Sequence, residues 1–210
     1  MVKRESATRR TQAERSEATR SALVGAARQL FSTQGYAAAG REDIVALAGV
    51  TRGALQHHFG DKRSLFLAVY EEVEAEVVEA TAGAAMAQGD DPLEQLRAGC
   101  HAYLDAVLDP AVQRICAIDG PAVLPADVRQ EITDRYALGL VRHGVEASVH
   151  NGSIDPSPVE PLTRMLLAGI MAAAQYVATS PDPRTARDEA GTTVDLLLDK
   201  LGRRSPPHGS

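Results

Sequence analysis

Residues 41–59 read REDIVALAGVTRGALQHHF, and this stretch decides the fold because it predicts two short helices joined by a tight turn. Gly40 is the expected N-cap of the first helix, and Thr51 is a good N-cap for the second, which runs to about His58. Between them, the small residues of Ala48-Gly49-Val50 allow the two helices to come close together. The stretch is therefore predicted to form a helix-turn-helix.

A longer amphipathic helix precedes this pair. Leu23, Ala27, Leu30 and Phe31 recur at helical spacing, so we expect a helix over residues 17–33 with Ser16 as its N-cap. These three helices predict a compact helix-turn-helix head over residues 16–61. The preceding residues 1–15 lack apolar periodicity and are expected to form a flexible basic arm.

The rest of the chain predicts an all-α fold, because runs of alternating β-branched and aromatic residues are almost absent. Residues 62–201 are expected to form a larger helical body, and residues 202–210 a flexible tail. About nine helices are expected in all, over residues 17–33, 41–48, 52–58, 62–86, 93–108, 111–118, 125–149, 159–179 and 184–201.

Charge is divided sharply along the chain. The 210 residues carry a net charge of −6, yet residues 1–70 hold 11 Lys and Arg against 6 Asp and Glu, whereas residues 71–210 hold 11 against 22. A basic head can approach phosphate while an acidic body is repelled by it. The division is compatible with a nucleic-acid-binding head, although a basic tail on an enzyme would give a similar count.

Nothing in the sequence suggests a membrane or an oxidising compartment. No apolar run approaches the roughly 20 residues that cross a bilayer, and the first residues are basic rather than apolar, so we expect a cytoplasmic protein without a membrane partner. The two cysteines, Cys100 and Cys116, then need not pair.

The head is similar to the tetracycline-repressor (TetR) family of bacterial transcription regulators. The resemblance covers about a quarter of the chain closely, and the matching stretches are residues 26–31, 35–36, 41–55, 57–59 and 61–65. It implies a DNA-binding regulator without enzymatic activity, most often a repressor that leaves a palindromic operator when a small-molecule effector binds. The runner-up is a helical small-molecule-binding protein or enzyme whose helix-turn-helix no longer reads DNA.

The second helix of the pair is expected to enter the major groove of double-stranded DNA. Arg52, Gln56 and His57 would face base edges there, and Gly53 would let the backbone approach closely. Phosphate contacts are expected from residues near helix ends, namely Arg41, Thr51, His58 and Lys62. Arg10, Arg15 and Arg20 are further candidates, or simply solvated charges.

Two positions depart from the family pattern. Family members commonly carry Tyr where Gln56 stands and Ser or Thr where Gly40 stands. Gln56 cannot stack as a Tyr does, and Gly40 has no hydroxyl for a cap or a phosphate contact. The departures put individual DNA contacts in doubt and leave the fold prediction intact.

The resemblance also implies a homodimer formed by the last two helices. An intramolecular core would use the same apolar stripes, so both uses remain open. The expected interface residues are Leu162, Met165, Leu166, Gly169, Ile170, Ala173, Val177, Val194, Leu197, Leu198 and Leu201.

A ligand cavity in the body is the family's usual effector site. Plain core is the alternative for each expected lining residue, and helical apolar stripes favour it. We also consider a cationic ligand, because Asp105 and Asp119 belong to an acidic body. The candidate lining residues are Cys100, Tyr103, Leu104, Ile115, Ile118, Leu124, Tyr136 and Leu140.

Metal and cofactor chemistry have little support in the sequence. His57 and His58 are adjacent on a helix and point about 100° apart, so they do not converge on one ion. Cys100, His101 and Cys116 match no compact zinc spacing. We therefore expect no metal, no cofactor and no catalytic site.

Overall fold

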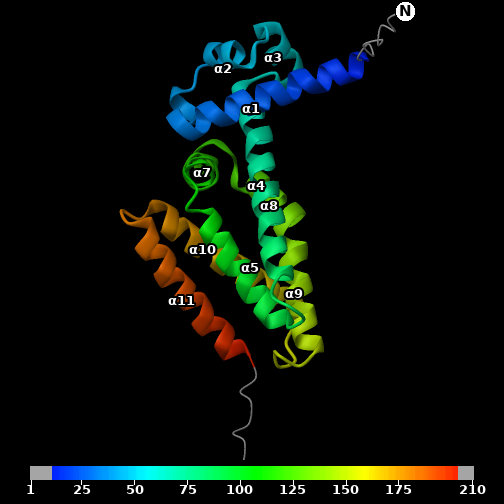
Figure 1. Ribbon diagram of the computed structural model, residues 1–210, viewed down its shortest axis with the longest axis vertical. Coiled ribbons are helices and arrows are strands. Elements are labelled where there is room, and N and C mark those ends of the chain that lie inside the picture. Colours follow the sequence, from blue (N-terminus) through cyan, green and yellow to red (C-terminus); the bar gives the residue numbers. More distant parts are fainter. Residues whose placement is uncertain (1–10, 203–210) are drawn as a thin grey trace, which may run out of the picture. The chain divides into compact units, whose positions relative to one another are not determined.

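The computed structural model describes residues 11–202, and within that range it is helical throughout apart from turns and one isolated bridge between Ile154 and Gly202 (Figure 1). The all-α prediction is confirmed. The chain divides into two compact units that meet at Val69 and Tyr70. The elements are α1 Gln12–Ala38, α2 Arg41–Ala48, α3 Arg52–Phe59, α4 Lys62–Met86, α5 Pro92–Ala106, α6 Pro110–Val112, η1 Gln113–Asp119, α7 Gly120–Val123, α8 Ala126–Thr133, η2 Asp134–Leu138, α9 Gly139–His150, α10 Val159–Thr179 and α11 Pro183–Leu201.

Helix α1 begins earlier than the sequence predicted. Thr11, not Ser16, is its N-cap: the Thr11 hydroxyl accepts a hydrogen bond from the N–H of Glu14, and the Glu14 carboxylate accepts one from the N–H of Thr11. This reciprocal capping box starts the helix within the expected flexible arm, so that residues 12–15 are helical. Residues 1–10 of that arm lie outside the described residues. Gly35, with φ of 81°, interrupts the helix near the predicted stop.

The helix-turn-helix forms as predicted. Gly49 closes α2 in the left-handed conformation, with φ of 66°, which a residue with a side chain rarely adopts. Thr51 then caps α3, its hydroxyl accepting from the N–H of Ala54 at 3.2 Å. Both helices pack on α1 (Figure 1). Gly40 precedes α2 without any side-chain cap bond.

The core of the first unit includes the start of α4, so this unit ends later than the predicted boundary at residue 61. The Phe66 ring packs edge-on against Phe31 at 5.3 Å and against Tyr36 at 5.1 Å between ring centroids. Leu65 and Phe66 are fully buried. Aromatic burial of this kind stabilises a small domain strongly, and it joins the first turns of α4 to the helix-turn-helix.

Two helical stretches of the second unit contain π-helical segments. The chain stays helical from α6 through η1 to α7, past the stop predicted at Asp119, and from α8 through η2 to α9. Gly120 allows this continuation because a side-chain carbon there would lie 2.7 Å from the Tyr70 ring. Pro121 sits in the first turn of α7, where a missing N–H costs little.

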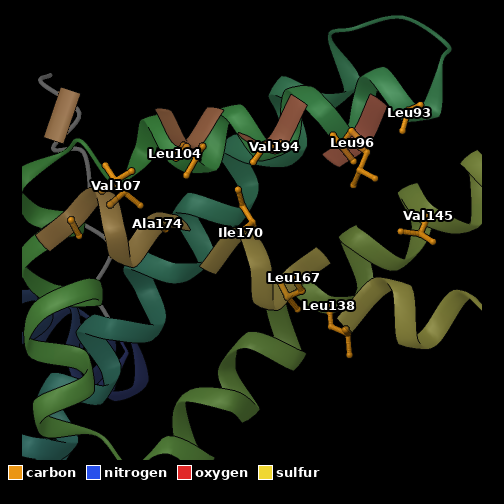
Figure 2. Close-up of a cluster of buried hydrophobic side chains, with 14 of the residues drawn as sticks. Leu93, Leu96, Leu104, Val107, Leu138, Val145, Leu167, Ile170, Ala174 and Val194 are labelled. Atoms are coloured by element: carbon orange, nitrogen blue, oxygen red, sulfur yellow. The ribbon is translucent and has the colours of Figure 1, made fainter. Parts of the chain in front are cut away.

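The body core gathers apolar side chains from α5, η2, α9, α10 and α11, which point toward one another in Figure 2. Helix α10 buries Leu167, Ile170, Ala174 and Val177 in it. By length and hydropathy α10 is the one helix among the described residues that resembles a membrane span, but its buried face and its packing on α5, α9 and α11 account for that composition. One such helix is weak evidence for a membrane protein.

Ion pairs join α5 to α11 at the edge of this core. Arg97 donates to Asp195 at 2.9 Å and to Asp199 at 2.6 Å, and His101 Nε2 lies 2.9 Å from the same Asp195 oxygen. His101 Nδ1 faces Arg187, whose guanidinium also binds Asp105. The hydrogen bonds from His101 and Arg97 hold the pKa of Asp195 below its usual value.

Replacing Asp195 with Asn should lower the free energy of unfolding by about 1 kcal/mol near neutral pH. Because the folded-state pKa of Asp195 is depressed, its stabilising contribution is complete above the unfolded pKa of about 4 and disappears as pH falls through the folded value. Urea unfolding at pH 7 and pH 3, at one protein concentration, should show the difference between wild type and variant shrinking at the lower pH. Asp90→Asn, in an exposed loop, is the control, and an Asp195 effect no larger than the Asp90 effect would contradict the assignment.

Candidate nucleic-acid interface and body cavity

Helix α3 has one buried residue and presents one side to solvent. Leu55 is 3% exposed, whereas Arg52, Gly53, Gln56 and His57 are all exposed. The three residues predicted to face base edges, and the glycine predicted to let the backbone approach, therefore share the outer face of one short helix. This is the arrangement that a helix entering a groove requires.

The residues predicted to contact phosphates differ from one another in their exposure and in their contacts. Arg41 is exposed at the start of α2. Thr51 uses its hydroxyl oxygen as a cap acceptor and keeps its proton as a donor. His58 is half-buried against His57, and the ammonium of Lys62 lies 4.4 Å above the Tyr36 ring. The ring holds that charge at the beginning of α4.

An acidic residue that the sequence argument missed lies beside the recognition face. Glu42 pairs with Arg52 at 2.6 Å, and both side chains are well exposed. They border a hollow of about 300 Å³ between α2 and α3 that Arg41, Gly53 and Gln56 also line. The sequence shows that Glu42 lies in the first turn of α2. It does not show that the packing of α2 against α3 brings Glu42 to Arg52, because the two residues belong to separate helices.

The basic residues of the predicted arm are only partly placed. The guanidinium of Arg20 lies over the Phe59 ring at 5.4 Å, which fixes it next to α3. Arg15 is exposed on α1, and Arg10 lies outside the described residues.

The body contains a cavity of about 410 Å³ between α4, α5, α9 and α10. Three of the eight predicted lining residues, Cys100, Tyr103 and Leu140, belong to its wall. The other five do not line it: Leu104, Ile115 and Leu124 are buried as core, Tyr136 is half-buried, and Ile118 is exposed. Helical spacing shows which face of a helix turns inward, but not whether the interior there is filled or hollow.

The wall residues that the sequence did not predict come from α4, which supplies the largest share, and from α5, α8, η2, α9 and α10. No local signal distinguishes them from ordinary core residues. They are Glu74, Thr81, Ala82, Ala85, Met86, Gln95, Leu96, Gly99, Thr133, Ala137, Val141, His143, Gly144, Leu167, Ile170 and Met171.

The residues predicted as a dimer interface divide into buried, exposed and half-buried groups. Ile170, Val177, Val194 and Leu198 are buried in the chain's own core and are not available to a partner, which corrects their assignment. Met165, Gly169 and Leu197 are exposed, and Leu162, Leu166, Ala173 and Leu201 are half-buried. Exposed neighbours that the prediction missed are Ala168, Ala172, Tyr176 and Leu196.

Cys100, His101 and Cys116 do not form a metal site. His101 is engaged by Asp195 and Arg187, and burial raises the pKa of the Cys100 thiol to about 11. Within residues 11–202, no three His, Cys, Asp or Glu side chains come together as metal ligands. Neither Cys100 nor Cys116 forms a disulfide.

Comparison with known proteins decides the family. Residues 93–201 match the family model of the tetracyclin repressor-like C-terminal domain, and residues 23–69 match that of the bacterial regulatory proteins of the tetR family. The chain belongs to the TetR family. A crystal structure of a TetR-family transcriptional regulator from Pectobacterium atrosepticum superposes on 94% of this chain and 100% of its own, with a TM-score of 0.82 and 32% identity.

Curated relatives agree with this family assignment. The HTH-type transcriptional regulator CymR of Pseudomonas putida is 32% identical over 59% of this chain, and the match spans 63% of CymR, less than two thirds of its length. The HTH-type transcriptional regulator AcrR of Shigella flexneri is 26% identical over 90% of this chain and 94% of its own. This TetR-family protein is thus a DNA-binding transcriptional regulator, and its relatives are regulators rather than enzymes.

Replacing Gly53 with Ala tests how closely α3 approaches DNA. In the free regulator the added methyl group would lie 3.7 Å from the Thr51 hydroxyl, an ordinary contact, so stability should stay level or rise by up to about 1 kcal/mol. If the backbone at Gly53 lies against a base, the same methyl group should weaken operator binding roughly tenfold or more in a fluorescence-anisotropy titration.

Gly25→Ala is the matched control, because Gly25 is an exposed glycine on α1 with open space around it. It should gain similar stability and keep full operator affinity. Unchanged operator binding by Gly53→Ala would show that this turn of α3 stays away from the duplex.

Proposed function

We propose that this TetR-family regulator is a dimeric repressor that places α3 in the major groove of a palindromic operator and is released by a small-molecule effector. The observation that carries the proposal is the outer face of α3. Arg52, Gly53, Gln56 and His57 face solvent there, while Leu55 anchors the helix from behind.

The exposed groups suit the donor and acceptor patterns of the groove. Arg52 can donate two hydrogen bonds to guanine, and Gln56 can pair with adenine. His57 can reach a neighbouring base edge, and Gly53 leaves room for the backbone to approach. Because Gln56 replaces the family's usual Tyr, we expect a base contact at this position where other members make a contact to the DNA backbone.

Contacts to phosphate would set the register of α3 on the duplex. We assign them to Arg41, Thr51, His58 and Lys62, which lie at or near helix ends. Tyr36 supports the Lys62 ammonium, so this charge is already positioned before DNA binds. Glu42 competes with DNA for Arg52, and this competition favours sites whose bases offer Arg52 a better partner than Glu42.

A palindromic operator requires two α3 helices related by a two-fold axis, which a homodimer supplies. The exposed apolar side chains of α10 and α11 support dimerisation through these two helices. Met165 is 73% exposed and Leu197 is 56% exposed in the single chain, and Gly169 allows close approach. Large apolar side chains left in water on adjacent helices are typical of an interface.

The cavity supports control by an effector. Helix α4 contributes Leu65 and Phe66 to the core of the first unit and Glu74 and Met86 to the cavity wall. A ligand that fits only one position of α4 would shift the population toward that position and away from the DNA-binding arrangement. A regulator bound to the operator would exclude other proteins from the same DNA and so repress transcription. An effector that releases the regulator would relieve this repression in the cytoplasm.

Selection of bound duplexes from a random pool tests the DNA-binding part of the proposal. A palindromic consensus would establish base recognition and two-fold symmetry together. Log affinity for the selected duplex should fall linearly with log salt, and Lys62→Ala should reduce that slope by about 1. Recovery of no sequence, together with a salt-independent affinity, would favour a helical ligand-binding protein whose helix-turn-helix does not read DNA.

A charge placed in the exposed face of α11 should prevent dimerisation. Leu197→Glu buries an unpaired carboxylate if Leu197 lies in an interface, so the variant should sediment as a monomer at micromolar concentration and lose operator binding. Leu47→Glu, at a 47% exposed leucine of α2, is the control for oligomeric state and should leave the dimer intact. A dimeric Leu197→Glu protein would move the interface elsewhere.

A further inference from the structure

The body cavity has an unusual combination of shape and charge. Its wall is largely aliphatic, and it includes one carboxylate, that of Glu74. The described residues place no Lys or Arg in the wall, and its other ionisable members are Cys100, Tyr103 and His143. An acid in an apolar cavity without a basic neighbour needs a compensating partner.

Glu74 is positioned by two donors of its own unit. Its carboxylate accepts hydrogen bonds from the Tyr70 hydroxyl and the Cys116 thiol. A carboxylate has about four acceptor positions, so these two donors leave capacity for a further donor. Burial raises the pKa of Glu74 and the two hydrogen bonds oppose that change, so a nearby positive charge would favour the ionised form.

The wall of α4 makes the cavity long. Glu74 and Met86 both line it, and 12 residues of helix separate them by ~18 Å. Met86 is 79% exposed, whereas Glu74 is half-buried, so the acid lies toward the inner end and Met86 toward the open end. The space therefore fits an extended ligand with its polar group at the Glu74 end.

Helix α5 forms a second wall of the cavity and packs against α4. Gly99 of α5 faces Thr81 and Ala85, since a side-chain carbon there would lie 3.6 Å and 3.7 Å from them. Tyr103, one turn after Gly99, lies near Glu74, so α5 runs antiparallel to α4. Burial and then the Glu74 charge raise the pKa of Tyr103, which places its ring within electrostatic reach of the acid. An aromatic face beside a carboxylate is a good environment for a cation.

The two acids considered from sequence are not the source of this charge. Asp105 pairs with Arg187 and Asp119 with Arg114, and neither lines the cavity. Glu74 remains the acid of the wall.

We propose that the effector is an elongated lipophilic amine, whose ammonium group pairs with Glu74 beside Tyr103 and whose apolar body extends along α4 toward Met86. This inference rests on the proposed function, because it names the chemical class of the effector for that same cavity. Anionic amphiphiles are disfavoured by Glu74, and neutral ones leave its charge uncompensated.

Three probes with one decyl chain and different head groups test the proposal. Decylamine, decanol and decanoate are titrated into the full-length dimer near neutral pH by isothermal calorimetry, below the concentrations at which they aggregate. Decylamine should bind roughly tenfold or more tightly than decanol, and decanoate should bind weakest. Glu74→Gln should weaken decylamine binding by roughly tenfold and change decanol binding by less than about threefold.

Glu79→Gln is the matched control, because Glu79 lies on the exposed face of the same helix. It removes one acid from α4 without touching the cavity wall and should leave all three affinities unchanged. If Glu74→Gln fails to fold, the order of the three probes on the unmodified protein still decides the question.

Equal binding of decylamine and decanol would overturn the proposal, and so would the absence of binding by all three probes. Tighter binding of decanoate would also overturn it and would direct attention to His143, the wall residue able to carry a positive charge. A separate operator titration distinguishes the two levels of inference. Decylamine that binds through Glu74 without weakening DNA binding would uphold the ligand class and contradict effector release.

Discussion

Burial of Leu55 is the constraint on which the proposed DNA-contacting face of α3 depends. A helix of eight residues has only about two turns, so one anchored side chain fixes its rotation about its axis. With Leu55 turned into the core, Arg52, Gln56 and His57 must face outward. The Gly49 turn and the Thr51 cap set where the helix starts, and the aromatic contacts of Phe31, Tyr36 and Phe66 stabilise the platform beneath it.

The two units are both built of helices but differ in their cores and in their exposed side chains. The first has a core of fully buried aliphatic and aromatic side chains and puts Arg52, Gln56 and His57 on the outside of a short helix, where they suit a DNA partner. The second retains a cavity of about 410 Å³ among its longer helices and leaves apolar side chains of α10 and α11 in solvent. A filled core would be more stable, but the proposed effector binding needs that space, and the proposed dimer needs that exposed apolar face.

Glu74 shows how a single residue can set the charge of such a cavity. From the sequence it is one of several acids along a long helix, with nothing to distinguish it from Glu72 or Glu79. Its surroundings come from three elements, because Tyr70 lies one turn earlier on α4, Cys116 lies in η1 and Tyr103 lies on α5. Only the packing of these elements turns an ordinary surface-type residue into the acid of an apolar wall.

The sequence by itself determined what depends on neighbouring residues. Helix bounds such as Arg41–Ala48, Lys62–Met86 and Val159–Thr179 follow from capping residues, glycines and apolar spacing within a few turns, and the helix-turn-helix follows from Ala48-Gly49-Val50 and Thr51. Local signals also failed where two of them competed, as when the Thr11 and Glu14 capping box started α1 before Ser16. Tertiary structure alone decided which apolar stripe residues are core and which are exposed, and which inward residues meet a hollow. Those properties depend on the volume between helices far apart in the chain, and no local pattern encodes that volume.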